Sequence, residues 1–153
     1  MPIKNYTTAV SEEKTVGEIM GLLAAKGARS IQINYGAQGR CSGVSFVLLV
    51  ETIPVPFRLP CNFEGVRKAM LKECKTWTTR QNYQSITDQV RRIAWRIVKD
   101  WVAAQMALIE AEQACLAQVF LPYVSYQDGT TAFDRFMLTV TQPERALGDG
   151  GTT

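Results

Sequence analysis

The longest regular pattern of apolar positions in this sequence lies between Ser85 and Phe120. This stretch contains no Gly or Pro, and its apolar residues recur at alternating steps of four and three, a period of about 3.5 residues. The repeating residues are Val90, Ala94, Ile97, Trp101, Ala104, Leu108, Ala111 and Cys115. A second apolar stripe beside them makes the arc wider than a coiled-coil seam needs. We therefore expect one long helix that covers its own domain on one side and packs against another helix on the other.

Shorter apolar patterns upstream of this helix predict β-strands. Arg29–Tyr35 alternates apolar and polar residues, as a half-buried strand does. Ser42–Glu51 is apolar on both faces in its latter half, which indicates a central strand, and the prolines around Phe57–Pro60 suit an edge strand. Ile3–Tyr6 fits a further short strand, and Thr130–Leu138 fits either a short helix or a strand. The pattern predicts an antiparallel meander of three to four strands.

Two further helices are predicted on either side of these strands. Thr15 and Glu18 have the spacing of a capping box at the start of a helix-period segment. Gly27 follows that segment where a left-handed C-terminal cap is expected. Gly17 and Gly21 inside it each lower helix propensity by about 1 kcal/mol relative to Ala. We therefore expect close packing at these two glycines, against the sheet or another helix.

The second of these helices follows the last strand. Asn62 is a suitable N-cap for a helix over Phe63–Cys74. The resulting order of elements predicts an α+β fold in which helices cover one face of the antiparallel meander. We expect residues 1–140 to form a single domain and residues 141–153, which are rich in Gly and Thr, to form a flexible tail.

The length of the predicted long helix indicates an oligomer. A helix of this length spans roughly 50 Å, about twice the width of a three- or four-stranded sheet with such strands. Val102–Val119 would then extend beyond its own sheet, and its many alanines would allow another helix to approach closely. A homodimer or higher oligomer that pairs through the long helix would cover it. In the alternative interpretation the helix kinks and folds back within the monomer.

Composition excludes several kinds of chemistry. The 153 residues contain no histidine, and four scattered cysteines form no CxxC pair. This excludes Ser-His and Cys-His nucleophile pairs and a Cys/His zinc site of ordinary spacing. The carboxylates show no spacing that recommends a catalytic pair. We therefore expect no enzyme activity, no metal and no cofactor.

Charge and hydropathy bear on the partners of the protein. A net charge of +3 is modest for a protein that binds duplex nucleic acid. No apolar run approaches the roughly 20 residues of a membrane span, and the first residues carry no signal-peptide core. We expect a cytoplasmic protein without a membrane partner.

A cluster of basic and aromatic residues is the best candidate for a binding site. Arginine can grip phosphate oxygens bidentately, and an aromatic ring can stack on a base. The candidate ligand-binding residues are Arg92, Arg96 and Lys99 for phosphates, Trp95 or Tyr83 for the base, and Arg58 and Tyr123 at the rim. Basic residues early in a helix also oppose its dipole, which suggests another use for them. In the alternative interpretation the tryptophans are core residues and the arginines pair with Asp88, Asp100 and Glu110 on a solvated face. Arg58 alone is equally compatible with edge protection of its strand.

Several stretches resemble one group of proteins. These are KTVGEIMGLLAAKGARSI, PFRLPCNFEGV, and VRRIAWRIVKDWVAAQMALIEAEQA followed by VFLPY. They resemble small uncharacterised proteins of tailed phages and integrated mobile elements, over about Tyr6–Tyr123. The resemblance implies no catalytic residues. It implies a context, because small accessory phage proteins are often counter-defence factors, some of them homo-oligomers that sequester nucleotide immune signals such as cyclic oligonucleotides or ADP-ribose derivatives.

Four functions follow from these observations. The first is a phage-encoded, homo-oligomeric, non-catalytic protein that binds and sequesters a small nucleotide ligand, for which Arg96→Ala should abolish ligand binding and leave the oligomer intact. The second is a protein-interaction inhibitor of a host defence protein. The third is a single-stranded nucleic-acid-binding accessory protein, which the modest charge disfavours. A nucleotide-degrading enzyme comes last because it has no base or metal site.

Overall fold

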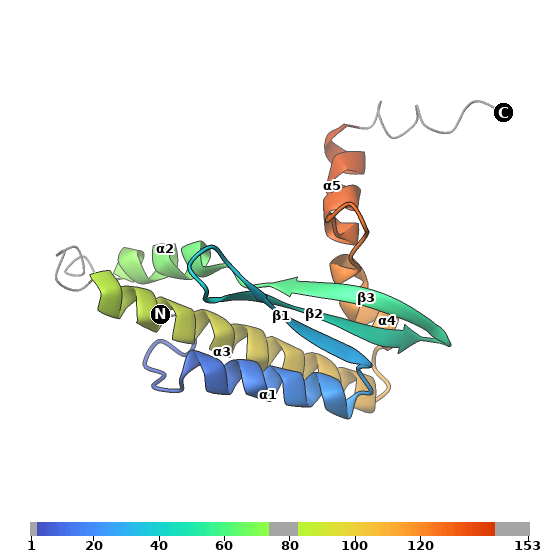
Figure 1. The fold of residues 1–153 in the computed structure, drawn as a ribbon, viewed down its shortest axis with the longest axis horizontal. Helices are drawn as coiled ribbons and strands as arrows, with labels where there is room; N and C mark the ends of the chain where they lie inside the picture. Colours follow the sequence, from blue (N-terminus) through green and yellow to red (C-terminus); the bar gives the residue numbers. More distant parts are fainter. Residues whose placement is uncertain (1–2, 74–82, 143–153) are drawn as a thin grey trace. The chain divides into compact units, whose positions relative to one another are not determined.

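The structure is a computed structural model that describes residues 3–73 and 83–142 (Figure 1). Its elements are α1 (Glu12–Ala25), β1 (Ser30–Tyr35), β2 (Cys41–Val50), β3 (Ile53–Pro60), α2 (Phe63–Glu73), α3 (Tyr83–Glu110), α4 (Leu116–Phe120), the 3-10 turn η2 (Leu121–Tyr123) and α5 (Ala132–Thr141). The predicted α+β class is confirmed. The chain divides into two compact units, which we describe separately. The helical unit contains Met1–Gly27 and Pro60–Ala111, and the sheet unit contains Ala28–Leu59 and Glu112–Thr153.

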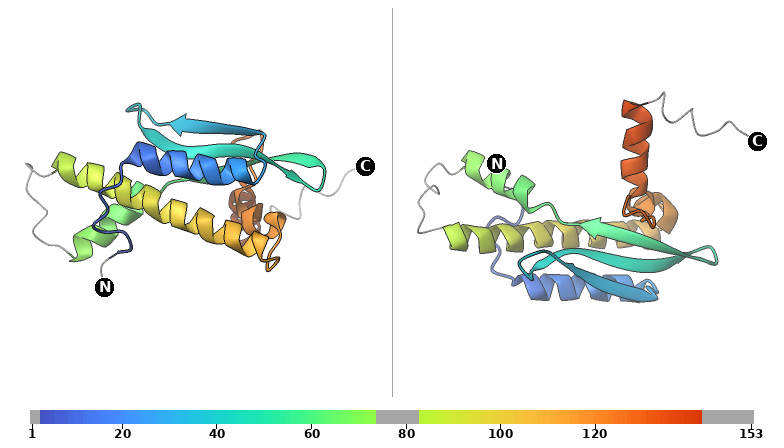
Figure 2. Two further views of the ribbon diagram at one scale, coloured as in Figure 1. Left: turned by 90° about the horizontal axis from the view of Figure 1, so that it is seen from below. Right: turned by 45° about the horizontal axis from the view of Figure 1, so that its top comes forward.

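Helix α1 begins earlier than predicted. Its N-cap is Ser11, whose hydroxyl oxygen accepts a hydrogen bond from the Lys14 N–H at 3.2 Å. Thr15, the predicted cap, lies inside the helix and is buried, and its hydroxyl donates to the Ser11 carbonyl at 3.2 Å. The predicted end is confirmed, because Gly27 has φ = 87°, a conformation that favours glycine. Within the helical unit α1 packs along α3, as both views of Figure 2 show.

The predicted close packing at the two α1 glycines is wrong for the described part of the chain. Gly17 and Gly21 are both exposed. A Cβ atom built on either of them would meet no other atom within 4 Å. Neither residue therefore serves close packing among the described residues of the helical unit.

Helix α2 begins as the sequence predicts. The side-chain oxygen of Asn62 accepts a hydrogen bond from the Gly65 N–H at 2.9 Å, which caps the helix. The buried face of α2 then joins the core of the helical unit. That core consists of Val66, Met70, Ile86, Val90, Ile93 and Ala94, with Ile3, Cys61, Phe63 and Ile97 packed around it.

The predicted long helix is interrupted. Helix α3 ends at Glu110, and Glu112 has φ = 56°, which no right-handed helix can contain. A separate helix, α4, begins at Leu116, and the side chain of Gln118 accepts a hydrogen bond from the Cys115 N–H at its start. The prediction of one helix to Phe120 is therefore wrong. The oligomer stays a prediction, but an uninterrupted projecting helix no longer supports it.

The sheet unit contains the predicted meander. The three strands lie in the order β1-β2-β3 (Figure 1). Strands β1 and β2 pair antiparallel from Ser30 opposite Val47 to Asn34 opposite Gly43, with an irregularity before Tyr35. Strand β3 begins at Ile53 and is longer than predicted. The predicted fourth strand is not among the named strands of the described residues, although Val124 forms an isolated bridge with Phe57 of β3.

Three phenylalanines form the aromatic core of the sheet unit. Phe46 of β2, Phe57 of β3 and Phe120 of α4 are fully buried, and their ring centroids lie 5.5 to 5.8 Å apart. Contacts of this kind stabilise beyond the area they bury. Phe120 therefore attaches α4 to the sheet of its own unit.

Thr130–Leu138, predicted as a helix or a strand, contributes most of helix α5. The predicted tail lies almost wholly outside the described residues, and the single domain over residues 1–140 stays a prediction. No helix among the described residues is long and apolar enough to cross a membrane.

Candidate functional site

The seven predicted site residues come from both units. Arg92, Trp95, Arg96 and Lys99 lie on α3 in the helical unit. The other described members, Arg58 on β3 and Tyr123 in η2, belong to the sheet unit. The side chain of Tyr83 lies outside the described residues. Only the four residues on α3 can therefore be assessed as one cluster.

Trp95 is a core residue. Its side chain is 0% exposed, and its indole N–H donates a hydrogen bond to Oε1 of Glu12 at 3.1 Å. The ring also meets the ring of Phe63 edge-on, with 6.1 Å between centroids. A base can stack only on an aromatic face that solvent can reach, and Trp95 presents no such face in this structure. Its position agrees with the alternative interpretation, in which the tryptophan belongs to the core.

Glu12 joins α1 to α3 through a buried ion pair. Nε and Nη2 of Arg91 donate to Oε1 of Glu12 at 2.9 and 2.5 Å. The two side chains are only 12% and 8% exposed, and the Arg91 guanidinium also lies 4.0 Å from the centre of the Phe63 ring. Sequence reasoning missed Glu12, because an acid in the first turn of a helix looks like an ordinary dipole partner.

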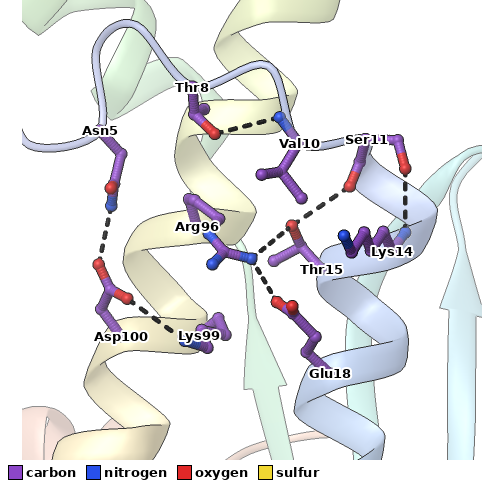
Figure 3. Close-up of polar contacts among 10 residues, drawn as sticks. All are labelled: Asn5, Thr8, Val10, Ser11, Lys14, Thr15, Glu18, Arg96, Lys99 and Asp100. Carbon is purple, nitrogen blue, oxygen red and sulfur yellow. Dashed lines mark hydrogen bonds and ion pairs between the residues drawn. The ribbon is translucent and has the colours of Figure 1, made fainter.

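Arg96 is paired in the same way one turn further along. Its Nη1 donates to Oε2 of Glu18 and, at 3.4 Å, to the hydroxyl of Thr15 (Figure 3). Glu18 had been predicted as a capping residue. It instead neutralises one of the arginines proposed to hold phosphate.

Lys99 and Asp100 lie at the outer edge of this cluster. Asp100 accepts a hydrogen bond from the amide of Asn5 at 2.9 Å and lies 3.8 Å from the Lys99 ammonium (Figure 3). The Lys4 ammonium lies 3.5 Å from the same carboxylate. The Asn5 hydrogen bond, helped by the charges of Lys4 and Lys99, lowers the pKa of Asp100 below its usual value. Asp100 therefore holds the N-terminal segment on α3, and Lys99 pairs with Asp100 from the same helix.

Arg92 takes part in the same attachment through an uncharged side chain. Its Nε and Nη2 donate to Oε1 of Gln89 at 3.0 and 2.7 Å. The amide nitrogen of Gln89 donates in turn to the carbonyls of Tyr6 and Thr8 at 3.2 and 3.0 Å. Gln89 thus links Arg92 to the segment that precedes α1.

We call the contact between α1 and α3 the polar layer, and define it by Glu12, Glu18, Arg91, Trp95 and Arg96. Each arginine in it meets a carboxylate of α1. Among the described residues no buried side-chain nitrogen or oxygen is without a hydrogen-bond partner. A phosphate group would have to displace Glu12 or Glu18 to reach these guanidinium groups. The polar layer therefore has the organisation of a structural contact between helices.

In the sheet unit, Arg58 holds a loop. Its Nη2 donates to the carbonyl of Gly129 at 2.5 Å, and Gly129 has φ = 85° at the turn before α5. Hydrogen bonds from the backbone and hydroxyl of Thr131 lower the pKa of Asp134, with a smaller contribution from the charge of Arg58. Tyr123 is half-buried in η2. Arg58 therefore fastens the turn at the start of α5, a role that neither prediction for it included.

Helix α5 carries the feature that sequence reasoning missed. Phe133, Phe136, Met137 and Val140 are 54%, 61%, 39% and 58% exposed, and we call these four residues the α5 face. They occur at i, i+3, i+4 and i+7, so they form one stripe along the helix. No residue of α5 is buried. The same spacing is visible in the sequence, but it was left undecided between helix and strand.

The charged residues of α5 are directed to the preceding loop. Asp134 accepts hydrogen bonds from the N–H and hydroxyl of Thr131, which form a capping box. Arg135 lies over the Tyr126 ring at 3.4 Å and also pairs with Asp128 at 3.4 Å. The helix start is thereby fixed by local polar contacts, and the α5 face itself contains no charge.

Comparison with known protein families, characterised proteins and solved structures found no match to this chain. Within residues 3–73 and 83–142, no three His, Cys, Asp or Glu side chains are grouped so that they could hold a metal ion. The polar layer and the α5 face are the features of the described residues that bear on function.

Proposed function

We propose that this protein is a non-catalytic protein-interaction module and that the α5 face is its binding element. The observation that carries the proposal is the exposure of four large apolar side chains in one stripe on a helix with no buried residue. Exposed apolar patches of this kind are typical of protein–protein contacts.

Helix α5 needs a partner for physical reasons. Isolated helices shorter than about 12 residues are marginal in water, and most helices are stabilised by packing of their apolar face. Burying a large apolar side chain is worth about 1.5–3 kcal/mol relative to full exposure. A ten-residue helix with four such side chains in water therefore gains both affinity and helicity when another protein chain covers it.

The spacing of the α5 face also matches a known recognition mode. Amphipathic helices that bind apolar grooves present their anchor residues at i, i+3, i+4 and i+7. Phe133 and Phe136 would be the principal anchors, since aromatic side chains dominate binding energy at interfaces. In the phage context that the sequence resembles, such a module would act by occupying a protein surface.

Nucleotide sequestration is supported less well by the same geometry. It assigns the phosphates to Arg92, Arg96 and Lys99 and the base to Trp95 or Tyr83. Arg96 is instead paired with Glu18, and Trp95 is buried. The function proposed here keeps the protein-interaction role of the second function considered from the sequence, but it places that role on α5 and assigns no host protein as the target.

Photo-crosslinking tests the proposal directly. A benzoyl-phenylalanine would replace Phe136 in one variant and Leu138 in the other, in cells that express the full chain. Leu138 is the matched control because it is 53% exposed and lies about 200° round the helix from Phe136. The proposal predicts adducts to a protein chain from position 136 and few from position 138. Equal labelling from both positions, or no adduct from either, would contradict it.

A further inference from the structure

We infer that the partner of the α5 face is a second copy of this chain, packed antiparallel to it about a twofold axis. This inference rests on the proposed function, because it names the protein that the α5 face binds. The symmetry of the stripe, the absence of charge on it and the composition of the following residues support this partner.

The stripe matches itself when one copy of the helix is reversed. Reversal about the midpoint between residues 136 and 137 exchanges 133 with 140 and 136 with 137. After the reversal, the set of apolar positions 133, 136, 137 and 140 coincides with itself. Each Phe133 then lies opposite a Val140 of the other copy, so a large side chain meets a smaller one. The two Phe136 and two Met137 side chains fill the central layer, next to the axis.

No charged side chain on the α5 face opposes its pairing with the α5 face of a second copy. In a twofold contact, a charged residue near the axis would face its own copy and be repelled. The α5 face contains no charged residue, and the two charged side chains of α5 are engaged with Thr131 and with the Tyr126–Asp128 loop. The same lack of charge gives the helix nothing with which to select an oppositely charged foreign partner.

The residues after α5 are a poor alternative cover. Residues 143–153 contain one large apolar side chain, Leu147, against four on the α5 face. Leu121 of η2, which contacts α5, is 60% exposed and adds apolar surface beside the helix. A second copy would present the same α5 face and Leu121, so each copy would cover these surfaces of the other.

The size of this contact predicts a weak dimer. A large side chain that is half exposed can bury on the order of 100 Å², so the α5 face with Leu121 would bury roughly 500 Å² per copy. Stable specific interfaces bury about 800 Å² per partner. We therefore expect a dissociation constant in the micromolar range, on the order of 10–100 μM, and a dimer population that depends on concentration.

Sedimentation equilibrium of the full chain tests this inference. The wild-type protein is expected to dimerise reversibly between about 1 and 500 μM. Phe136→Asp is expected to raise the dissociation constant at least about 30-fold, because it removes two central anchors and places two carboxylates beside each other. Leu138→Asp adds the same charge on the opposite side of the helix and should change it less than about threefold. Circular dichroism of each variant confirms that it is folded.

Orientation is tested by mixing two variants. Antiparallel pairing places residue 133 opposite residue 140 of the other copy. A mixture of Phe133→Asp with Val140→Lys should therefore associate about tenfold more tightly than either variant alone. A mixture of Phe133→Asp with Phe133→Lys is the control, because only a parallel pair would bring those two charges together. Tighter association of this control mixture than of the first mixture would overturn the antiparallel arrangement.

The remaining outcomes also decide the inference. A wild-type monomer at every concentration, or a dimer that Phe136→Asp leaves intact, would overturn it. Photo-adducts from position 136 to a different protein, together with a monomeric wild type, would overturn the second copy as partner and leave the proposed function standing. If neither photo-adducts nor a dimer were found, both the second copy as partner and the proposed function would be overturned.

Discussion

Helices α3 and α5 differ in where their charged and apolar side chains lie. Charged and aromatic residues of α3 lie against α1, where Arg91, Arg96 and Trp95 meet Glu12 and Glu18. On α5 the apolar side chains lie in solvent, and the charged ones contact the preceding loop. The comparison shows that a basic and aromatic cluster in a sequence indicates a binding site only if its partners lie outside the chain.

The comparison also shows which observation carries more information. Exposed charged residues and buried apolar residues are ordinary, whereas a buried polar group or an exposed apolar patch requires a cause. The burial of Glu12 is explained within the helical unit, where its carboxylate accepts hydrogen bonds from Arg91 and Trp95. The α5 face has no counterpart in the described chain that buries it, and we therefore assign the interaction to α5.

The largest expected effect tests whether the polar layer is structural. Glu12→Gln removes the carboxylate that Arg91 and Trp95 share in a buried position. We expect a loss of about 3 kcal/mol in the free energy of unfolding, measured with urea, because breaking one side of a buried ion pair strands the other charge. Glu13→Gln changes the neighbouring exposed acid and serves as the control. Equal stability of the two variants would mean that the contacts of Glu12 in the polar layer do not contribute to stability.

A smaller effect is expected at Arg96. Its pair with Glu18 is partly exposed, at 18% and 36%, so solvent screening reduces its contribution. Arg96→Ala should lower the free energy of unfolding by about 1.5 kcal/mol, between the values of exposed and buried pairs. A double-mutant cycle with Glu18→Ala should show that the two residues are coupled. Additive effects would mean that their ion pair contributes nothing to stability.

At the other helix, the N-cap of α5 should matter because no residue of this helix is buried. Thr131→Ala removes the capping box with Asp134 and should cost about 1 kcal/mol of helix stability. Faster amide exchange across α5 in dilute protein would report it. Thr139→Ala, in the interior of the same helix, is the control and should not speed exchange. If Thr131→Ala behaved like Thr139→Ala, something other than its cap would be holding α5.

The smallest effect depends on pH. The pKa of Asp100 is lowered, chiefly by the Asn5 hydrogen bond, so its contribution to stability is present above the usual carboxyl pKa near 4 and is lost as the pH falls through the lowered value. Asp100→Asn should therefore reduce the free energy of unfolding by about 0.5 kcal/mol at pH 7. Urea titrations between pH 7 and pH 2 should show that the difference becomes smaller as the pH falls. A difference that persisted unchanged at pH 2 would assign the effect to packing.

Local signals in the sequence predicted most of the elements. Alternation predicted the strands of the meander, and Asn62 and Gly27 marked helix ends because caps depend on only a few neighbouring residues. The break after Glu110 could not be predicted in this way. Glu112 adopts a positive φ although it is not glycine, so neither Gly nor Pro marked the site.

The candidate site was harder to predict because its contacts are distant in sequence. Arg91 and Glu12 are 79 residues apart, and Arg96 and Glu18 are 78 apart. Helical periodicity shows that α3 has a polar side but does not show which helix meets it. The α5 face had a readable spacing, and only its exposure, which depends on the folded chain, indicated a binding surface.

Hydrogen exchange measured by mass spectrometry at two protein concentrations tests the central claim, that the α5 face binds a second copy of this chain and the polar layer does not. Dilute protein at about 1 μM and concentrated protein at about 500 μM bracket the expected dissociation constant. The account predicts that α5 amides become protected at the higher concentration while α3 amides exchange at the same rate in both. Unchanged exchange in α5, or new protection confined to α3, would contradict it.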